Sequence, residues 1–271
     1  MSALPQVSPD WLVLRAAADD RSRSAELADA AAALLPPGRL VVHDLGSGSG
    51  AMMRWLAPRL AGPQRWVLHD ADAGILEHRD PAPPVDAAGR PALTTTSVEQ
   101  LAELEPAALS NASLVVASAL LDVITWSEAR TVVAACVAVG APTLFSLTVA
   151  GRVELDPPNP DDDIVATAFN THQRRDADGR RLLGPDAVGV VAGLFAGAGW
   201  RLRVVDTPWR LGSGDGELIA EWLDGWLDAA VEQAPLLRDR AEAFRAQRRA
   251  QLADGRLRVV IHHQDVLAWP A

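Results

Sequence analysis

Short apolar runs alternate with helical patterns through most of the chain. Runs of strand length occur at LVVHDL (40–45), RWVLHD (65–70), LVVAS (114–118) and TLFSLTV (143–149). Met52, Leu56 and Leu60 recur at helical spacing directly after the first run, and the patterns at 98–109 and 127–139 also predict helices. This alternation is typical of a parallel sheet that is covered by helices on both faces and binds its ligand at the carboxyl ends of the strands.

The flanking regions predict additional helices and one interruption. Ser8 followed by Pro9 predicts a helix start, and a second helix over 24–35 would complete an N-terminal helical cap, residues 1–38, ahead of a domain at 39–271. The polar stretch 150–184 interrupts the alternation and is interpreted as a substrate loop.

The alternation returns after this stretch. A helix at 185–198 and a strand at 200–206 are expected, then a helical insertion at 212–254 and a final strand that begins near Arg256. An amphipathic pattern from Leu218 to Val231 predicts a helix whose apolar face packs either in the core or in a homodimer interface.

Composition narrows the class of protein. The 271 residues are 49% hydrophobic and 22% charged, which suits one globular unit with a sizeable core. The net charge of −10 argues against nucleic acid as the main partner, and the arginines of 238–249 alternate with acids as on a solvated helix face. We expect a cytoplasmic protein, since the chain shows no signal-peptide pattern and no apolar run of membrane-spanning length.

The strand at 40–45 leads into HDLGSGSG, the most informative segment of the chain. Gly46, Gly48 and Gly50 allow a tight turn and a close approach of the backbone to a ligand, and the following helix directs unpaired N–H groups toward it. These features suit any nucleotide-like ligand. Asp44 discriminates among them, because a carboxylate would be repelled by phosphates but can orient an ammonium group.

The segment resembles the first motif of class I S-adenosylmethionine-dependent methyltransferases, an acid and one further residue followed by Gly-x-Gly-x-Gly, which Asp44, Gly46, Gly48 and Gly50 match in full. The resemblance implies S-adenosylmethionine as cofactor. It also implies an α/β fold, a Rossmann-like doubly wound seven-stranded sheet whose last strand is antiparallel, with helices on both faces.

The resemblance further implies roles for residues at the strand ends. Asp70 would hold the ribose hydroxyls, with Asp72 as a second candidate, and Ser118 would lie near the transferred methyl group. The chain departs from the family at the adenine site, where Ser97 and the backbone of Val98 stand in place of the usual acid. The predicted cofactor-binding residues are Asp44, Gly46, Ser47, Gly48, Gly50, Asp70, Ala71, Ser97, Val98 and Ser118.

Candidates for the chemical step are weaker, and each has a plainer interpretation. His172 and Asp122 are candidate catalytic residues, His172 as a general base, although a loop histidine can equally be merely exposed. Candidate substrate-binding residues are Trp126, Asn170 and Arg174. No metal site is predicted, because the acids of 156–163 have no second cluster of ligands.

The N-terminal helical region offers one more candidate group. Arg15, Asp19 and Arg23 are spaced by four residues, which permits a ladder of ion pairs on one helix face. The alternative is that one of the arginines reaches the carboxylate of the cofactor.

We therefore predict a methyltransferase that acts by direct displacement on an oxygen or nitrogen of a small molecule, in specialised biosynthesis. The same letters GSGSGA also satisfy Gly-x-Gly-x-x-Ala, so an NAD(P)-binding Rossmann oxidoreductase is one alternative. An RNA methyltransferase and a catalytically silent binding protein on the same fold are the others.

Overall fold

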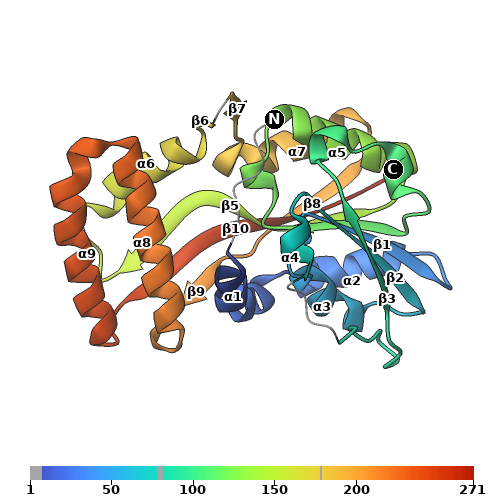
Figure 1. The fold of residues 1–271 in the computed structure, drawn as a ribbon, viewed down its shortest axis with the longest axis horizontal. Helices are drawn as coiled ribbons and strands as arrows, with labels where there is room; N and C mark the ends of the chain where they lie inside the picture. The colour runs from blue at the N-terminus through green and yellow to red at the C-terminus, as the bar shows by residue number, and fades with distance from the viewer. Residues whose placement is uncertain (1–7, 78–81, 178) are drawn as a thin grey trace.

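A computed structural model describes residues 8–77, 82–177 and 179–271 and shows a mixed α/β fold around one eight-stranded sheet (Figure 1). Its strands lie in the order β3-β2-β1-β4-β5-β10-β8, and β9 pairs with β10. β10 runs antiparallel to β5, β8 and β9, whereas the β3-β2-β1-β4-β5 pairs are parallel. The strands are β1 (Leu40–Leu45), β2 (Gln64–Asp70), β3 (Leu93–Val98), β4 (Leu114–Ser118), β5 (Thr143–Asp156), β8 (Arg201–Asp206), β9 (Trp209–Leu211) and β10 (Arg258–Trp269).

This arrangement confirms the predicted doubly wound sheet whose last strand is antiparallel. β9 is an eighth strand that the sequence did not indicate. The strand order changes direction between β1 and β4, and in an open α/β sheet that point is where ligands bind.

Two apolar layers enclose the sheet. One face packs against α2 (Ala25–Leu34) and α3 (Ala51–Leu56), and the other against α5 (Trp126–Val139) and α7 (Ala187–Gly197). Neighbouring strand residues serve opposite layers, since Val116 joins the first cluster and Val115 the second. The expected helices on both faces are confirmed.

A third apolar cluster forms a lobe on the extended ends of β5 and β10. It consists of α6 (Asp162–Gln173), α8 (Gly216–Gln233) and α9 (Arg238–Ala253), at the left of Figure 1. The apolar face of α8, including Leu223 and Trp226, is buried in this cluster, so the core interpretation of the amphipathic helix is correct for that face. α1 (Pro9–Ser22) packs Ala18 against the same cluster.

Two local expectations are wrong. Residues 150–184 are largely regular, because β5 continues to Asp156 by pairing with β10, and α6 buries Val165 and Ala168 against α8. A hairpin of β6 (Asp176–Ala177) and β7 (Arg180–Arg181) follows. In place of a helix over 98–109 there are two 3-10 turns, at Leu101–Glu103 and Pro106–Leu109, since Pro106 lacks an N–H for a continuous helix.

Helix starts agree better with the sequence. Ser8 caps α1 and Ser24 caps α2, each by accepting a backbone N–H bond, from Trp11 and Leu27 respectively. Within the described ranges, no helix combines the length and the apolar character needed to cross a bilayer.

Candidate functional site

A cavity of about 320 Å³ opens at the carboxyl ends of β1, β2 and β4, within the size range of small-ligand sites. Its lining includes the glycine turn (Gly46–Ser49) and the start of α3. It also includes residues 70–75, from the end of β2 into α4 (Ala73–Glu77), the end of β4 (Ser118–Leu120), and the inner side of α1 with the residue that follows it. From this last segment the lining residues are Leu12, Arg15, Asp19 and Arg23. The N-terminal helical region therefore forms one wall of the cavity.

The glycine turn needs its glycines for two separate reasons. Gly46, Gly48 and Gly50 all have positive φ angles, of 60°, 52° and 80°, which side chains disfavour. A Cβ on Gly46 would also lie 2.6 Å from Cδ1 of Leu120, inside van der Waals contact. The turn is held to β2 by Ser47 N, which donates to His69 O (3.0 Å), and by Gly48 N, which donates to Oδ2 of Asp70 (2.9 Å).

Asp44 lies at the cavity wall with its side chain fully buried. Neither of its carboxyl oxygens has a hydrogen-bond partner in the part of the chain that the structure describes. Burial raises the pKa of this carboxyl to about 8; the charge of Arg23 opposes the rise and that of Asp70 adds to it. A cation bound beside this carboxyl would lower its pKa and favour the ionised form.

Arg23 stands beside Asp44 and is equally enclosed, with 1% of its side chain exposed. Its Nη1 donates to Oδ1 of Asp20 (2.6 Å) and its Nη2 to Oγ of Ser118 (3.2 Å), which leaves Nε without a partner among the described residues. Burial lowers the pKa of this guanidinium, while Asp19 and Asp20 act in the opposite direction. A buried acid beside a buried guanidinium suits a ligand that carries both an ammonium and a carboxylate.

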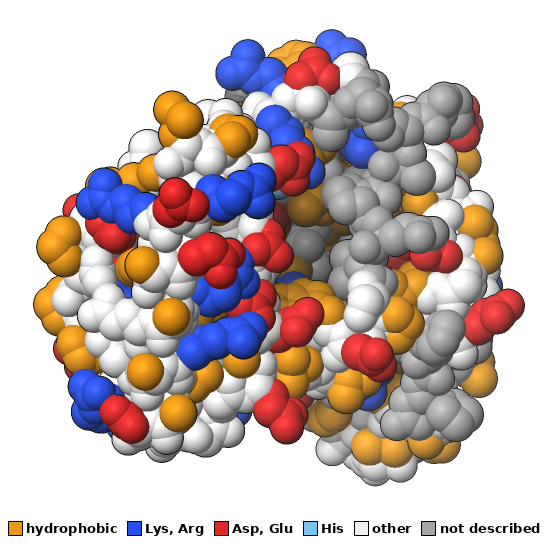
Figure 2. All heavy atoms as spheres, turned by 60° about the vertical axis from the view of Figure 1, so that its left-hand side comes forward, with side chains coloured by type: hydrophobic (Ala, Val, Ile, Leu, Met, Phe, Trp, Pro, Cys, Tyr) orange, Lys and Arg blue, Asp and Glu red, His pale blue; other side chains and the backbone are white. Residues whose placement is uncertain are grey.

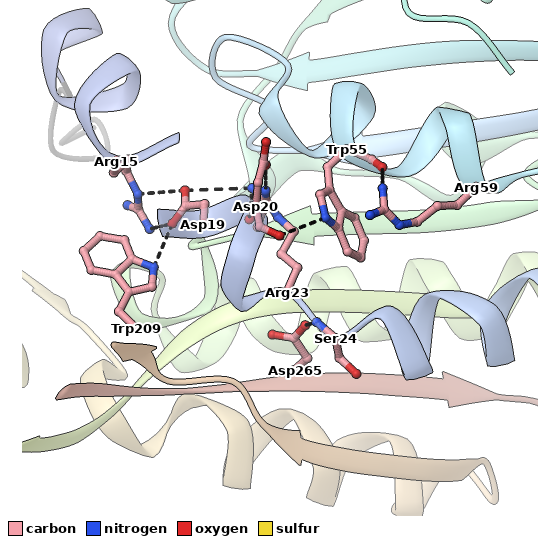
Figure 3. A network of polar contacts seen from close by, with 10 residues as sticks. Arg15, Asp19, Asp20, Arg23, Ser24, Trp55, Arg59, Trp209 and Asp265 are labelled. Carbon is pink, nitrogen blue, oxygen red and sulfur yellow. Dashed lines mark hydrogen bonds and ion pairs between the residues drawn. The ribbon is translucent and has the colours of Figure 1, made fainter. Parts of the chain in front are cut away.

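Arg15 and Asp19 form a second ion pair on the same wall, shown in Figure 3. Arg15 Nε donates to Oδ2 of Asp19 (2.9 Å), and Trp209 Nε1 donates to Oδ1 of Asp19 (3.0 Å). The guanidinium of Arg15 also lies 5.0 Å from the centre of the Trp209 ring. The expected ladder of ion pairs exists, and it lines the cavity, so the two interpretations of these residues do not exclude each other.

Most of the predicted cofactor residues come together in this cavity. Asp44, Gly46, Ser47, Gly48, Asp70, Ala71 and Ser118 line it, and Gly50 ends the turn as the N-cap of α3. Both oxygens of Asp70 already accept backbone N–H groups, from Gly48 and Asp72. Ser97 and Val98 lie beside His69 and Asp70 in the sheet register but outside the cavity lining.

The candidates for catalysis and substrate binding are dispersed. His172, in the last turn of α6, faces Glu232 of α8 with its Nε2 3.1 Å from the carboxylate. Asn170 donates to Gly151 O (2.6 Å), Arg174 pairs with Asp186, and Trp126 is 51% exposed. None of these four side chains lines the cavity among the described residues.

Asp122 differs from those four because it lies between residues that contact the cavity. It belongs to a 3-10 turn, Leu121–Val123, that follows β4, and both Leu120 and Val123 line the cavity. Its Oδ1 is buried without a hydrogen-bond partner in the described chain, and burial raises the pKa of the carboxyl to about 6.

Sequence reasoning missed a buried polar chain behind the site. Nδ1 of His43 lies 2.8 Å from Nε2 of His69, and Nδ1 of His69 contacts Oε1 of Glu99, which also accepts from Oγ of Ser97. The signal was present, because both strands that carry the site acids contain His-Asp at or near their ends, at 43–44 and 69–70. Since neighbouring strand residues face opposite sides of the sheet, the histidines support the strand ends from behind.

Most arginines of α9 form ion pairs with acids of the same lobe. Arg245 pairs with Asp224 and Asp228, Arg248 with Asp162, and the remaining pairs are Arg240–Asp161 and Arg249–Asp224. Figure 2 shows side chains of both signs interleaved over this face. These pairings argue against a phosphate-binding track, but the expected solvated face is wrong for Arg248, which is fully buried.

Comparisons with known proteins give similarities of fold at low sequence identity. No family model matches the chain, and no curated protein matches it. One similar solved structure is the cyclopropane synthase MmaA2 from Mycobacterium tuberculosis, at 16% identity over 89% of this chain and 82% of that chain, with a TM-score of 0.45.

Two further structures are a geranyl diphosphate methyltransferase in complex with GPP and sinefungin, and a SAM-dependent methyltransferase from Thiobacillus denitrificans in complex with S-adenosyl-L-homocysteine. The first is 14% identical over 91% of this chain and 78% of that chain, with a TM-score of 0.48. The second is 15% identical over 97% and 98%, with a TM-score of 0.46. The doubly wound sheet of this chain and its antiparallel β10 agree with the fold that the resemblance implies, and the chain has this Rossmann-like α/β fold.

Proposed function

We propose that the chain is an S-adenosylmethionine-dependent methyltransferase that acts on a small molecule. The observation that carries the proposal is the buried carboxyl of Asp44, which has no hydrogen-bond partner among the described residues and lies beside the buried guanidinium of Arg23 at the cavity wall. Leaving the Asp44 carboxyl desolvated is costly unless a ligand of complementary charge completes the site, and Nε of Arg23 is also left without a partner among the described residues. The amino-acid end of S-adenosylmethionine carries the required ammonium and carboxylate.

The residues present fit the amino-acid and ribose parts of this cofactor. Asp44 would hold the ammonium and Arg23 the carboxylate, while Gly46 and Gly48 let the backbone approach closely. The carboxylate of Asp70, which lines the cavity, has further lone pairs for the ribose hydroxyls. When bound, the cofactor supplies a methyl group on a sulfonium that is already activated for displacement.

The protein's own contribution would be to position the acceptor, exclude water and hold a proton. Leu12, Leu120 and Val123 give the cavity apolar walls, which favour an acceptor with an apolar body. Asp122, with its pKa raised to about 6, is the group next to this region that would take a proton from an oxygen or nitrogen acceptor. We prefer it to His172, whose ring faces Glu232, because Asp122 lies between the lining residues Leu120 and Val123, although Asp122 is not itself among the described lining residues.

The site also weighs against the alternative cofactor. A dinucleotide would bring its pyrophosphate to the glycine turn, where an ionised Asp44 would oppose it. The net charge of −10 and the paired arginines of α9 likewise favour a small-molecule acceptor over RNA.

Calorimetric titration tests the proposal. At pH 8 we expect S-adenosylhomocysteine to bind with a micromolar or lower Kd and NADPH to show no measurable heat of binding. Binding of NADPH without binding of S-adenosylhomocysteine would refute the methyltransferase assignment. Screening metabolites for transfer of a labelled methyl group would then identify the acceptor.

A further inference from the structure

Asp265, on β10, joins three separate segments of the chain through one buried carboxylate. Its side chain is buried, and its Oδ2 accepts the backbone N–H of Ser24 (2.9 Å). Its Oδ1 accepts both the backbone N–H of Leu147 (2.7 Å) and the hydroxyl of Thr207 (2.8 Å). Figure 3 shows Asp265 below the corner where α1 meets α2, next to Ser24 and Arg23.

Two of these donors are connected to residues of the cavity wall, one directly along the chain and one through a hydrogen bond. Ser24 directly follows Arg23, which lines the cavity. Leu147 directly follows Ser146, whose carbonyl accepts the N–H of Ala119 (2.9 Å), another lining residue. Asp265 itself does not line the cavity in the described chain, so any effect that it has on a ligand must act through these neighbours.

The contacts close into a ring. From Asp265 the connection runs through Ser24 to Arg23, and Arg23 Nη2 donates to Oγ of Ser118. Ser118 precedes Ala119, and the path returns through Ser146 and Leu147 to Asp265. The two walls that face the amino-acid end of the proposed cofactor are thus held at a fixed separation by one carboxylate.

The backbone in this ring is held in an uncommon conformation. Ala119 and Leu147 have φ angles of 53° and 57°, in the left-handed region that residues other than glycine rarely adopt. Such conformations persist where the surrounding contacts over-determine them, and they cluster at functional sites. The bond from Leu147 N to Asp265 and that from Ala119 N to Ser146 O are such contacts.

We infer that Asp265 is a positioning residue for the end of the cavity that receives the amino-acid part of the cofactor. This inference rests on the proposed function. In an Asp265→Asn variant, one acceptor oxygen becomes an NH₂ donor, which must face either Ser24 N or Leu147 N and Thr207 Oγ1. The hydrogen bonds on one side of Asp265 are then lost, and either Arg23 or the end of β4 is no longer held in position.

The test compares two ligands that differ in the amino-acid part. S-Adenosylhomocysteine carries the amino acid, and 5′-methylthioadenosine has the same nucleoside and sulfur without it. For Asp265→Asn, we expect calorimetry to show at least a tenfold weaker Kd for S-adenosylhomocysteine and a Kd within twofold of wild type for 5′-methylthioadenosine. An Asp265→Asn variant that binds both ligands normally, or loses both equally, overturns the inference.

Asp86→Asn is the matched control. Asp86 is also buried and accepts two backbone N–H groups, from Ala88 and Arg90, and a side-chain bond from Arg90, but it lies in the loop before β3 and outside the cavity lining. Both ligands should bind this variant within twofold of wild type. Equal losses in Asp86→Asn and Asp265→Asn would overturn the inference by showing a general effect of a lost buried carboxylate.

A second variant covers poor folding of Asp265→Asn. Thr207→Val keeps the side-chain shape and removes one donor to Asp265, so we expect a threefold to tenfold loss for S-adenosylhomocysteine alone. Unchanged affinity for both ligands in Thr207→Val would then overturn the inference. Failure of the wild-type protein to bind either ligand is a different result, since it refutes the proposed function on which the inference depends.

Discussion

Replacing Asp44 by asparagine separates the stability of the protein from its function. The carboxyl is fully buried, lacks a hydrogen-bond partner within the described residues and has a pKa raised from 3.8 to about 8 by burial. In the unfolded chain the same group ionises near 3.8. Between these two values the folded protein retains a proton that the unfolded chain has released, so the free energy of unfolding must fall as the pH rises.

The size of the effect follows from the two pKa values. Each pH unit between them removes about 1.36 kcal/mol, so wild type should lose about 4 kcal/mol of unfolding free energy from Asp44 between pH 5 and pH 8. Asparagine resembles the protonated acid in shape and cannot ionise. We therefore expect the unfolding free energy of Asp44→Asn, relative to that of wild type, to rise by about 4 kcal/mol between pH 5 and pH 8. Its affinity for S-adenosylhomocysteine should be at least a hundredfold weaker than that of wild type.

Urea denaturation at pH 5, 6, 7 and 8 measures this difference, with Asp86→Asn as the control. Hydrogen bonds from Arg90 and Ala88 lower the pKa of Asp86. The unfolding free energy of Asp86→Asn should therefore not rise relative to that of wild type as the pH increases to 8. A difference between Asp44→Asn and wild type that stays constant across the four pH values would refute the reasoning. So would a variant that keeps wild-type affinity for S-adenosylhomocysteine.

Cofactor binding should release the proton that Asp44 retains in the free protein. If the ammonium of the ligand requires an ionised Asp44, binding at pH 7 releases about 0.9 proton from a group whose pKa is about 8. Titration in buffers of different ionisation enthalpy counts this proton. The affinity of wild type should rise about tenfold per pH unit from pH 6 to pH 7, whereas that of Asp44→Asn should not change.

Three further predictions concern other parts of the chain. Gly46→Ala places a Cβ 2.6 Å from Leu120 Cδ1 at a positive φ angle, so we expect calorimetry to show more than a hundredfold loss of S-adenosylhomocysteine affinity. His172→Gln should leave that affinity within twofold, because the ring faces Glu232 outside the cavity; a tenfold loss would place His172 at the site after all. Burial and His69 lower the pKa of His43 to about 4, so the unfolded chain alone takes up the proton below pH 6.5. Between pH 6.5 and pH 4.5, the unfolding free energy of wild type should therefore fall by about 2 kcal/mol more than that of His43→Gln, as measured by urea denaturation.

Features of the fold that depend on short segments were predicted well. The caps at Ser8 and Ser24, the strands that carry Asp44 and Asp70, and the glycine turn all depend on residues within a few positions of each other. Expectations were wrong where pairing between distant strands overrides the local polarity of the sequence. Residues 150–156 read as the start of a polar loop but form a strand, because β10 supplies hydrogen-bond partners from a segment about 100 residues later.

What the sequence by itself determined is the glycine turn and the acid before it, at the end of the cavity where we propose that the cofactor binds. Positive φ angles favour glycine, and an acid before the turn disfavours phosphate. The roles of Asp44 and the three glycines can therefore be predicted from one short segment. Only the tertiary structure decided the rest. It brought Arg23 to Ser118, 95 residues away, placed Ser24 on Asp265, 241 residues away, and directed His172 toward Glu232 instead of the cavity. Such contacts arise from the packing of whole elements against one another, and no pattern within a single segment records them.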